Sequence, residues 1–181
     1  MTLAEHFTGV ALGSPWRGLA WLQRQLPAQV QLTAVQATPG LARRAAERGA
    51  ARIAAAQATR HRPPNEPSAL SCSHSAGWGL ALAGPARWRL GADLEYLPTL
   101  NARVLHLSLA ESAYKAGMGQ RRFQPEDYHW QAGCRPGEAR VWNVQGDSIP
   151  AHWVWEDHFL LTACVQAPEH LTELRPPRKS A

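Results

Sequence analysis

The chain has 181 residues, of which 45% are hydrophobic, and its formal net charge is +5 with an isoelectric point near 9.6. This length suffices for one domain or two small fused lobes with a buried core, and the charge favours acidic partners such as nucleic acid, phosphorylated small molecules or acidic proteins. Because the sequence has no membrane-length apolar run, no signal-peptide pattern and no cysteine spacing typical of zinc sites or disulfide frameworks, we expect a reduced, cytoplasmic protein.

In chain order, the first predicted elements are a short helix and a strand. Trp16, Leu19 and Leu22 are spaced along one face of a short amphipathic helix that ends before Pro27. Residues 30–37 alternate apolar and polar side chains, which predicts a strand, and the Pro-Gly pair at 39–40 predicts a turn.

The next predicted element is an alanine-rich helix over residues 41–59. Arg44, Arg48 and Arg52 are spaced four residues apart, so their guanidinium groups lie along one helical face. This pattern fits a basic stripe exposed to solvent, and it also fits an anion-binding face. A stiff proline-rich loop is predicted over residues 61–67.

Strands dominate the predictions for the rest of the chain. Residues 68–73 and 78–84 form a hairpin-like pair, and residues 87–95 form the next strand. A connector over 96–103 leads to a helix over 104–118, and several short strands follow, with turns at 136–137 and 146–147. We expect residues 168–181 to form a frayed tail.

Acidic residues gather in the stretch from the third of these strands to the helix. Asp93 and Glu95 are two residues apart on a predicted strand, so they share one face, and Glu111 and Lys115 are four apart on the helix. Three carboxylates and a lysine that converge could hold Mg²⁺ against a phosphate. The same spacing also fits an edge strand with exposed acids and a helix with an ordinary Glu–Lys pair, and spacing alone favours this second interpretation.

The order of the motifs resembles that of the 4′-phosphopantetheinyl transferase superfamily. The similar segments are AERGAAR (46–52), SCSHS (71–75), GADLE (91–95) and SLAESAYKAGMG (108–119), so the resemblance covers about residues 41–119. The larger, pseudo-dimeric type, which activates surfactin and enterobactin synthetases in secondary metabolite biosynthesis, is the more similar. The resemblance implies an α+β fold of two similar small lobes, each a helix packed on a mainly antiparallel sheet. The expected lobes are 1–103 and 104–181, with the active site in the cleft between them.

The resemblance also implies an activity and a set of site residues. The 4′-phosphopantetheine group of coenzyme A is transferred to a serine of an acyl- or peptidyl-carrier protein, with Mg²⁺ as cofactor and 3′,5′-ADP as product. The protein is expected to be a monomer with no nucleic-acid or membrane partner. The implied roles are metal binding by Asp93, Glu95 and Glu111, proton abstraction by Glu111, phosphate binding by Lys115, and coenzyme A binding by Ser73, His74 and Arg52.

Two positions depart from the family pattern. Leu107 replaces an aromatic residue, and Ala110 replaces a lysine that helps to hold the phosphates. Arg121 or Arg122 could supply the missing cation. A non-catalytic or weakly active relative that binds coenzyme A or a carrier protein is therefore the main alternative. A basic nucleic-acid-binding domain is a further alternative, although no nucleic-acid motif accompanies the charge.

Overall fold

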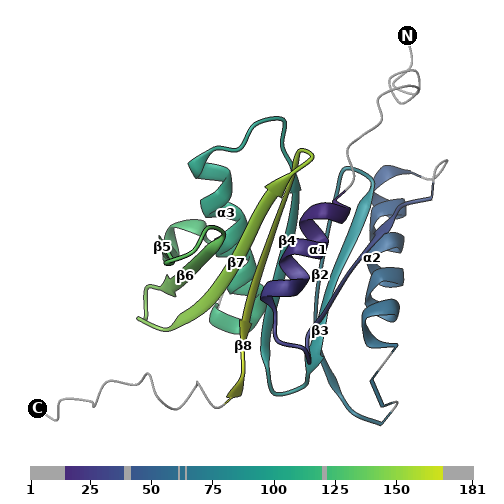
Figure 1. The fold of residues 1–181 in the computed structure, drawn as a ribbon, viewed down its shortest axis with the longest axis horizontal. Coiled ribbons are helices and arrows are strands. Elements are labelled where there is room, and N and C mark those ends of the chain that lie inside the picture. Colours follow the sequence, from purple (N-terminus) through teal and green to yellow (C-terminus); the bar gives the residue numbers. More distant parts are fainter. Residues whose placement is uncertain (1–14, 39–41, 61, 64, 120–121, 169–181) are drawn as a thin grey trace, which may run out of the picture.

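The computed structural model describes residues 15–38, 42–60, 62–63, 65–119 and 122–168 (Figure 1). The predicted turn at 39–40, Arg121 and all but the first residue of the predicted tail lie outside these ranges. The helices are α1 (Trp16–Gln25), α2 (Arg43–Thr59) and α3 (Ala102–Ala113), which continues as a π-helical turn (Tyr114–Met118). The strands are β1 (Gln31–Gln36), β2 (Ser68–Ser75), β3 (Trp78–Pro85), β4 (Arg89–Tyr96), β5 (Tyr128–Ala132), β6 (Glu138–Asn143), β7 (Ser148–Glu156) and β8 (Phe159–Gln166).

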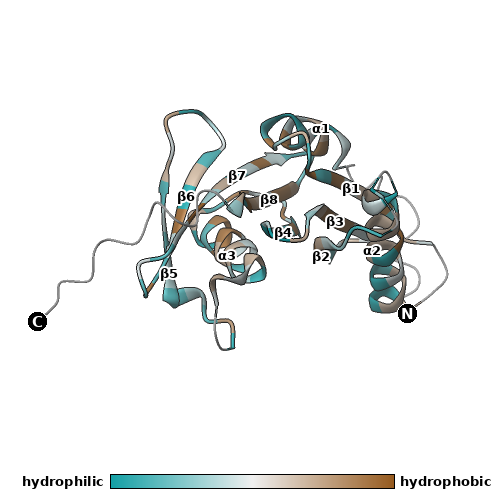
Figure 2. Cartoon of the chain, turned by 90° about the horizontal axis from the view of Figure 1, so that it is seen from below, coloured by the Kyte–Doolittle hydropathy of each residue, from teal (hydrophilic) through white to brown (hydrophobic). Residues whose placement is uncertain are grey.

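These strands form two antiparallel sheets, so the α+β prediction is confirmed. The first sheet has the order β1-β3-β2, and the second has the order β4-β8-β7-β6-β5. Helix α2 packs on the first sheet, whereas α1 and α3 lie on opposite sides of the second sheet (Figure 2). Strand β4 pairs with β8 along its length although it precedes residue 103, where the lobe boundary was predicted. The pseudo-dimer and its boundary stay predictions.

The core consists mainly of two apolar clusters on the two faces of the second sheet. On β8, Leu161 and Ala163 join the cluster beneath α1, while Leu160 and Cys164 join the cluster beneath α3. Every residue of this strand is buried, which explains why its sequence, FLLTACVQ, is an almost continuous apolar run. Within the described ranges, each helix is too short or too polar to cross a lipid bilayer.

The predicted hairpin is confirmed, and its turn is tighter than expected. Ala76 and Gly77 alone connect β2 and β3, with φ values of 46° and 80°. Two positive φ values are the geometry of a type I′ turn, whose twist matches that of the flanking strands. His74 therefore lies within β2 and not in the connecting turn where the sequence pattern had placed it.

Helix α3 begins two residues earlier than predicted and ends sooner as regular α-helix. The side chain of Asn101 accepts a hydrogen bond from the backbone N–H of Val104 at 3.0 Å, which is an N-cap. After Ala113 the chain forms the π-helical turn, in which Gly117 has a φ of 81°. The turn carries Lys115, and such turns are frequent at functional sites.

A close approach between α3 and β4 depends on Gly91. A Cβ atom at this position would overlap the carbonyl oxygen of Ser112. We expect Gly91→Ala to force α3 away from β4 and to lower the free energy of unfolding by about 1–3 kcal/mol, the usual cost of overpacking. Urea denaturation followed by circular dichroism measures this change.

Gly49→Ala is the matched control, because a Cβ at Gly49 of α2 meets no atom within 4 Å. In a helix this substitution should stabilise the protein by up to about 1 kcal/mol. Equal stabilities for the two variants would contradict the close packing of α3 on β4.

Candidate metal centre

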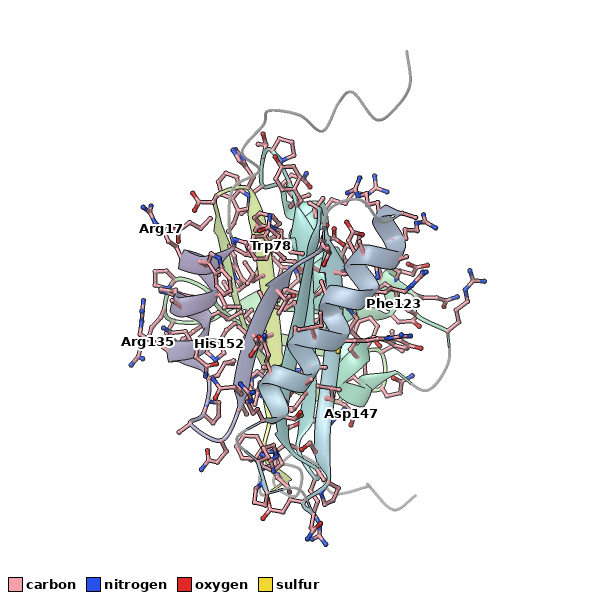
Figure 3. All side chains as sticks on the ribbon, turned by 90° about the vertical axis from the view of Figure 1, so that its right-hand side faces the viewer. Arg17, Trp78, Phe123, Arg135, Asp147 and His152 are labelled. Atoms are coloured by element: carbon pink, nitrogen blue, oxygen red, sulfur yellow. The ribbon has the colours of Figure 1, made fainter. Side chains whose placement is uncertain are left out.

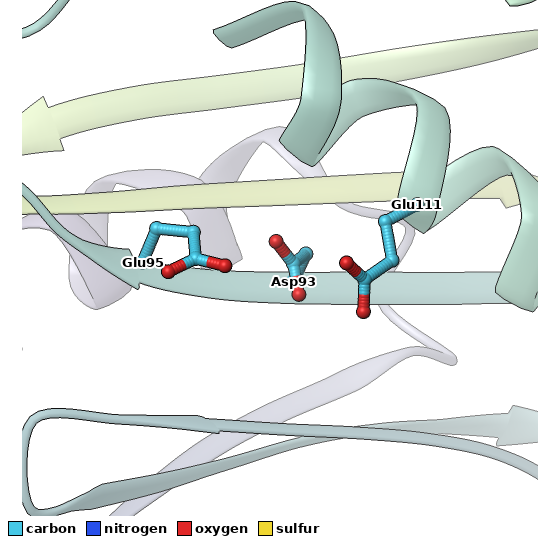
Figure 4. Close-up of side chains that lie close together, drawn as sticks. All are labelled: Asp93, Glu95 and Glu111. Carbon is cyan, nitrogen blue, oxygen red and sulfur yellow. The ribbon is translucent and has the colours of Figure 1, made fainter. Parts of the chain in front are cut away.

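The structure brings the three predicted carboxylates together. Asp93 and Glu95 extend from one face of β4, and Glu111 reaches them from α3, with one oxygen of each group within 4.8 Å of the others (Figure 4). The alternation of β4 gives the first two a common face, and the close approach at Gly91 brings the helix within reach. The cluster therefore depends on strand periodicity and on one glycine contact.

Asp93 is the most deeply held of the three. Its side chain is 2% exposed. Its Oδ1 accepts hydrogen bonds from Ser73 Oγ at 2.8 Å and from Lys115 Nζ at 3.0 Å, and its Oδ2 accepts one from Ser108 Oγ at 2.9 Å. Ser108 also contacts Thr162 Oγ1 at 3.0 Å, which ties the carboxylate to β8. Three donors from three different elements thus fix the Asp93 carboxylate in one orientation.

Lys115 lies between two of the carboxylates. Its Nζ is 3.0 Å from Asp93 Oδ1 and 2.9 Å from Glu111 Oε1, and it also donates to the carbonyl oxygen of Ala92 at 3.2 Å. Burial lowers the pKa of Lys115, but Asp93 and Glu111 outweigh burial, so this pKa is raised overall. The ammonium group is therefore charged at neutral pH and offsets part of the negative charge of the cluster.

Glu95 is left with the uncompensated charge. Its carboxylate receives no hydrogen bond from any described residue, and burial together with Asp93 and Glu111 raises its pKa from 4.5 to about 7, while Lys115 opposes the rise. Burial is the larger cause of this rise, and the part that comes from Asp93 and Glu111 reflects a negative potential that a divalent cation would neutralise. The donor set, which consists of three carboxylates, fits Mg²⁺.

Ser73 lies in a row of serines that joins the two sheets. Ser71, Ser73 and Ser75 alternate along β2, and Ser71 Oγ accepts from the backbone N–H of Ala92 at 3.0 Å, while Ser75 Oγ accepts from that of Tyr96 at 3.3 Å. Ser73 Oγ donates to Asp93 Oδ1, and the coenzyme A binding expected of Ser73 stays a prediction. The pattern Ser-x-Ser-x-Ser was visible in the sequence, although its role in bridging two sheets was not predicted.

His74 makes its contact on α2, away from the three carboxylates. Its Nδ1 is 3.5 Å from Glu47 Oε2, and Glu47, which is 5% exposed, also accepts hydrogen bonds from the Gly77 backbone and from Arg43. Burial raises the pKa of Glu47, but these hydrogen bonds and the charges of Arg43 and His74 lower it overall. Glu47 therefore carries a charge on the side of β2 that faces α2, and sequence reasoning missed it.

The arginines of α2 are exposed. Arg44, Arg48 and Arg52 all lie on the solvent side of the helix, and no ion pair involves Arg52 among the described residues. The buried face of α2 consists mainly of alanines, which allow the helix to lie close to the first sheet. The basic stripe thus has the placement expected of a solvated face, and the structure does not bring Arg52 to the carboxylates.

The positions that depart from the family pattern differ in environment. Ala110 is 1% exposed and belongs to the cluster beneath α3, so the first carbons of a lysine side chain at this position would lie in the core. Leu107 is half-buried. Arg122 is exposed at the edge of a cavity of about 500 Å³ lined by Tyr114 and Tyr128. In the described part of the chain, Lys115 is the one cation in contact with the carboxylates.

Comparison with protein-family models and with curated proteins identifies no relative. No protein-family model matches the chain, and no curated protein matches it. The assignment of a function therefore rests on the motifs and on the geometry of the site.

Proposed function

We propose that this chain is a cytoplasmic, monomeric 4′-phosphopantetheinyl transferase that moves the phosphopantetheine group of coenzyme A to a serine of an acyl- or peptidyl-carrier protein. The observation that carries the proposal is the convergence of Asp93, Glu95 and Glu111, of which Asp93 and Glu111 contact the ammonium group of Lys115. Asp93 and Glu95 on the strand precede Glu111 on the helix by 18 and 16 residues (111 − 93 and 111 − 95). The fold brings the three carboxylates together. This excess of negative charge around one lysine supports a site for Mg²⁺ and a phosphorylated substrate.

The proposed metal ligands are Asp93, Glu95 and Glu111. When bound, Mg²⁺ would neutralise charge on the coenzyme A pyrophosphate and on the phosphoryl group in transfer. Asp93 is suited to the role because its orientation is fixed by three donors, and Glu95 because none of its oxygens is occupied by a hydrogen bond from a described residue. Ser73 is then a positioning residue that orients Asp93.

The remaining residues take part in proton transfer and phosphate binding. The serine oxygen of the carrier protein forms a bond to the phosphorus of the phosphopantetheine group, the bond to 3′,5′-ADP breaks, and the hydroxyl proton goes to Glu111. Lys115 holds Oε1 of Glu111, so Oε2 is the oxygen available to accept the proton. The three N–H groups of the Lys115 ammonium are directed to Asp93, Glu111 and the Ala92 carbonyl, so Lys115 would attract a phosphate oxygen through its positive charge and would have to release one of these acceptors to donate to it.

The arrangement as two lobes is part of the same proposal. The carboxylates extend from β4, and the serine row of β2 joins the first sheet to the second at this strand. This placement supports two lobes with the active site in the cleft between them. His74 and Arg52, which lie on the α2 side of the first sheet, would then bind a part of coenzyme A that extends away from the carboxylates.

A non-catalytic module that binds coenzyme A or a carrier protein is the second candidate. The burial of Ala110 favours it, because no second cation replaces the family lysine among the described contacts of the cluster. The intact carboxylates favour the transferase.

The test is the intact mass of a panel of apo carrier proteins after incubation with the protein, coenzyme A and Mg²⁺. The expected result is a mass increase of one phosphopantetheine group that depends on Mg²⁺. No increase across the panel, while a carrier protein or coenzyme A still binds, would establish the non-catalytic module.

Glu95→Gln is expected to reduce the rate of transfer by about a hundredfold or more, since it removes a metal ligand without removing a hydrogen bond. It should also affect stability in a pH-dependent manner. The folded-state pKa of Glu95 is raised from 4.5 to about 7, so the folded protein binds the proton more tightly than the unfolded chain does. This proton contributes fully to the free energy of unfolding below pH 4.5, and the contribution is lost as the pH rises through 7. Without Mg²⁺, the glutamine variant should therefore gain stability relative to the wild type between pH 5 and pH 8.

Calorimetric Mg²⁺ titration, denaturation at the two pH values in EDTA, and the mass assay together measure these effects. Glu126→Gln at an exposed position is the matched control and should change none of them. Unchanged Mg²⁺ binding in Glu95→Gln would exclude Glu95 as a ligand.

A further inference from the structure

A second candidate site lies on the far side of the five-stranded sheet. Where α1 ends, a cavity of about 770 Å³ opens over β6, β7 and β8, a volume within the usual range for small-molecule sites. Its wall includes Pro150 and His152, which alternate on β7 with Ile149 and Ala151 of the cluster beneath α3. It therefore faces away from α3, on the side where α1 packs and where Figure 3 labels His152.

Two tryptophans supply the apolar wall of this cavity, which we call the Trp88–Trp142 cavity. Both indoles are half-buried, and Trp142 stacks on His129 with ring centroids 5.3 Å apart and an interplanar angle of 3°. Since His129 and Trp142 are also paired across β5 and β6, the stacking holds the indole plane in place. A fixed indole is suited to a flat aromatic ligand, because stacking then costs little side-chain entropy.

The charged lining of the cavity is basic, with one carboxylate, Glu138, nearby on the same face of β6 as Arg140. Arg140 is the only charged side chain among its described lining residues, and no carboxylate is among them. Its Nη1 donates to Ser148 Oγ at 3.1 Å, which orients the guanidinium, whose other N–H groups are donors for an anion. His152 adds no positive charge at neutral pH, because burial lowers its pKa, although Glu138 opposes this.

His152 also leaves a polar atom unpaired. Its Nδ1 is buried with no hydrogen-bond partner among the described residues. Since this atom is inaccessible to solvent, the polar contact that the cavity offers to a ligand comes from Arg140 and not from His152 Nδ1.

We propose that the Trp88–Trp142 cavity binds a small, flat aromatic anion, with its ring against the tryptophans and its carboxylate, sulfonate or phosphate on Arg140. This site is separate from the carboxylate cluster, whose residues extend from β4 toward α3. The proposal therefore stands whether or not the chain is a transferase.

The experiment compares two fluorescent probes that share one ring system. The first, 8-anilinonaphthalene-1-sulfonate, carries a negative charge, and the second, N-phenyl-1-naphthylamine, is neutral. The wild-type protein should bind one molecule of the sulfonate probe in a saturable manner, with quenching of tryptophan emission. Arg140→Gln should weaken the binding of the sulfonate by about tenfold or more and change that of the neutral probe by less than about twofold.

Charge reversal with Arg140→Glu, at an exposed position, should weaken sulfonate binding further. Trp142→Leu should weaken both probes, and Trp142→Phe keeps an aromatic wall if the leucine variant does not fold. Arg135→Gln and Trp155→Leu are controls at other exposed positions, and they should leave both affinities unchanged. Non-saturable binding, or equal effects of Arg140→Gln on the two probes, would overturn the proposal.

Discussion

Replacing Asp93 with alanine is expected to abolish transfer and to lower the free energy of unfolding by about 3–5 kcal/mol, the cost of breaking a buried, hydrogen-bonded ion pair. Asp93 is buried and accepts hydrogen bonds from Ser73, Ser108 and Lys115. Its removal leaves the buried hydroxyl of Ser108 and the ammonium of Lys115 without this acceptor. Urea denaturation in EDTA measures the stability, and the intact-mass assay measures transfer.

The alanine variant alone does not separate a metal ligand from a structural residue, because a partly unfolded protein also fails to transfer. Asp93→Asn retains the size of the side chain and one acceptor oxygen, so it should lose less stability while still losing transfer. Transfer by the asparagine variant at the wild-type rate would show that the charge of Asp93 is not needed. Wild-type stability of Asp93→Ala would show that the three hydrogen bonds contribute little.

The sequence predicted the part of the site that depends on local periodicity. Asp93 and Glu95 share a face because side chains alternate along a strand, and Glu111 and Lys115 share one because they are four apart on the helix that leads into the π-helical turn. Both rules involve only neighbours in the chain. The hairpin of β2 and β3 was predictable for the same reason, since its strands are adjacent in sequence.

Long-range contacts account for what the sequence did not predict. Strand β4 pairs with β8, about 70 residues further along the chain (162 − 93 = 69 for the pair Asp93 and Thr162), and no local pattern specifies that partner. The Ser108 hydroxyl meets Asp93 and Thr162 only because α3 packs across these two paired strands. The same limitation applies to the buried carboxylate of Glu47, whose partner Gly77 is 30 residues away.

The electrostatic balance of the cluster follows from these contacts. The cluster combines three carboxylates with one ammonium group, and Lys115 contacts Asp93 and Glu111 but is not within ion-pair distance of Glu95. Burial is the largest cause of the raised pKa of Glu95, and repulsion from Asp93 and Glu111 adds to it. Protonation of Glu95 and the binding of a divalent cation are two ways to relieve this repulsion, so they should exclude each other.

Lys115→Met is expected to lower the free energy of unfolding by about 3 kcal/mol in EDTA, because it leaves Asp93 and Glu111 close together without their cation. If Mg²⁺ compensates the same charge, the variant should gain more stability from Mg²⁺ than the wild type does, and the difference between the two proteins should narrow as Mg²⁺ approaches saturation. Transfer should nevertheless remain low, since the positive charge that attracts the phosphate is lost.

Denaturation at a series of Mg²⁺ concentrations measures how Mg²⁺ binding and stability are linked. Arg103→Met, at an exposed position of α3, is the control for removal of a surface charge. An equal stability difference with and without Mg²⁺ would mean that Lys115 and the metal do not act on the same carboxylates, and the proposed ligand set would then have to be revised.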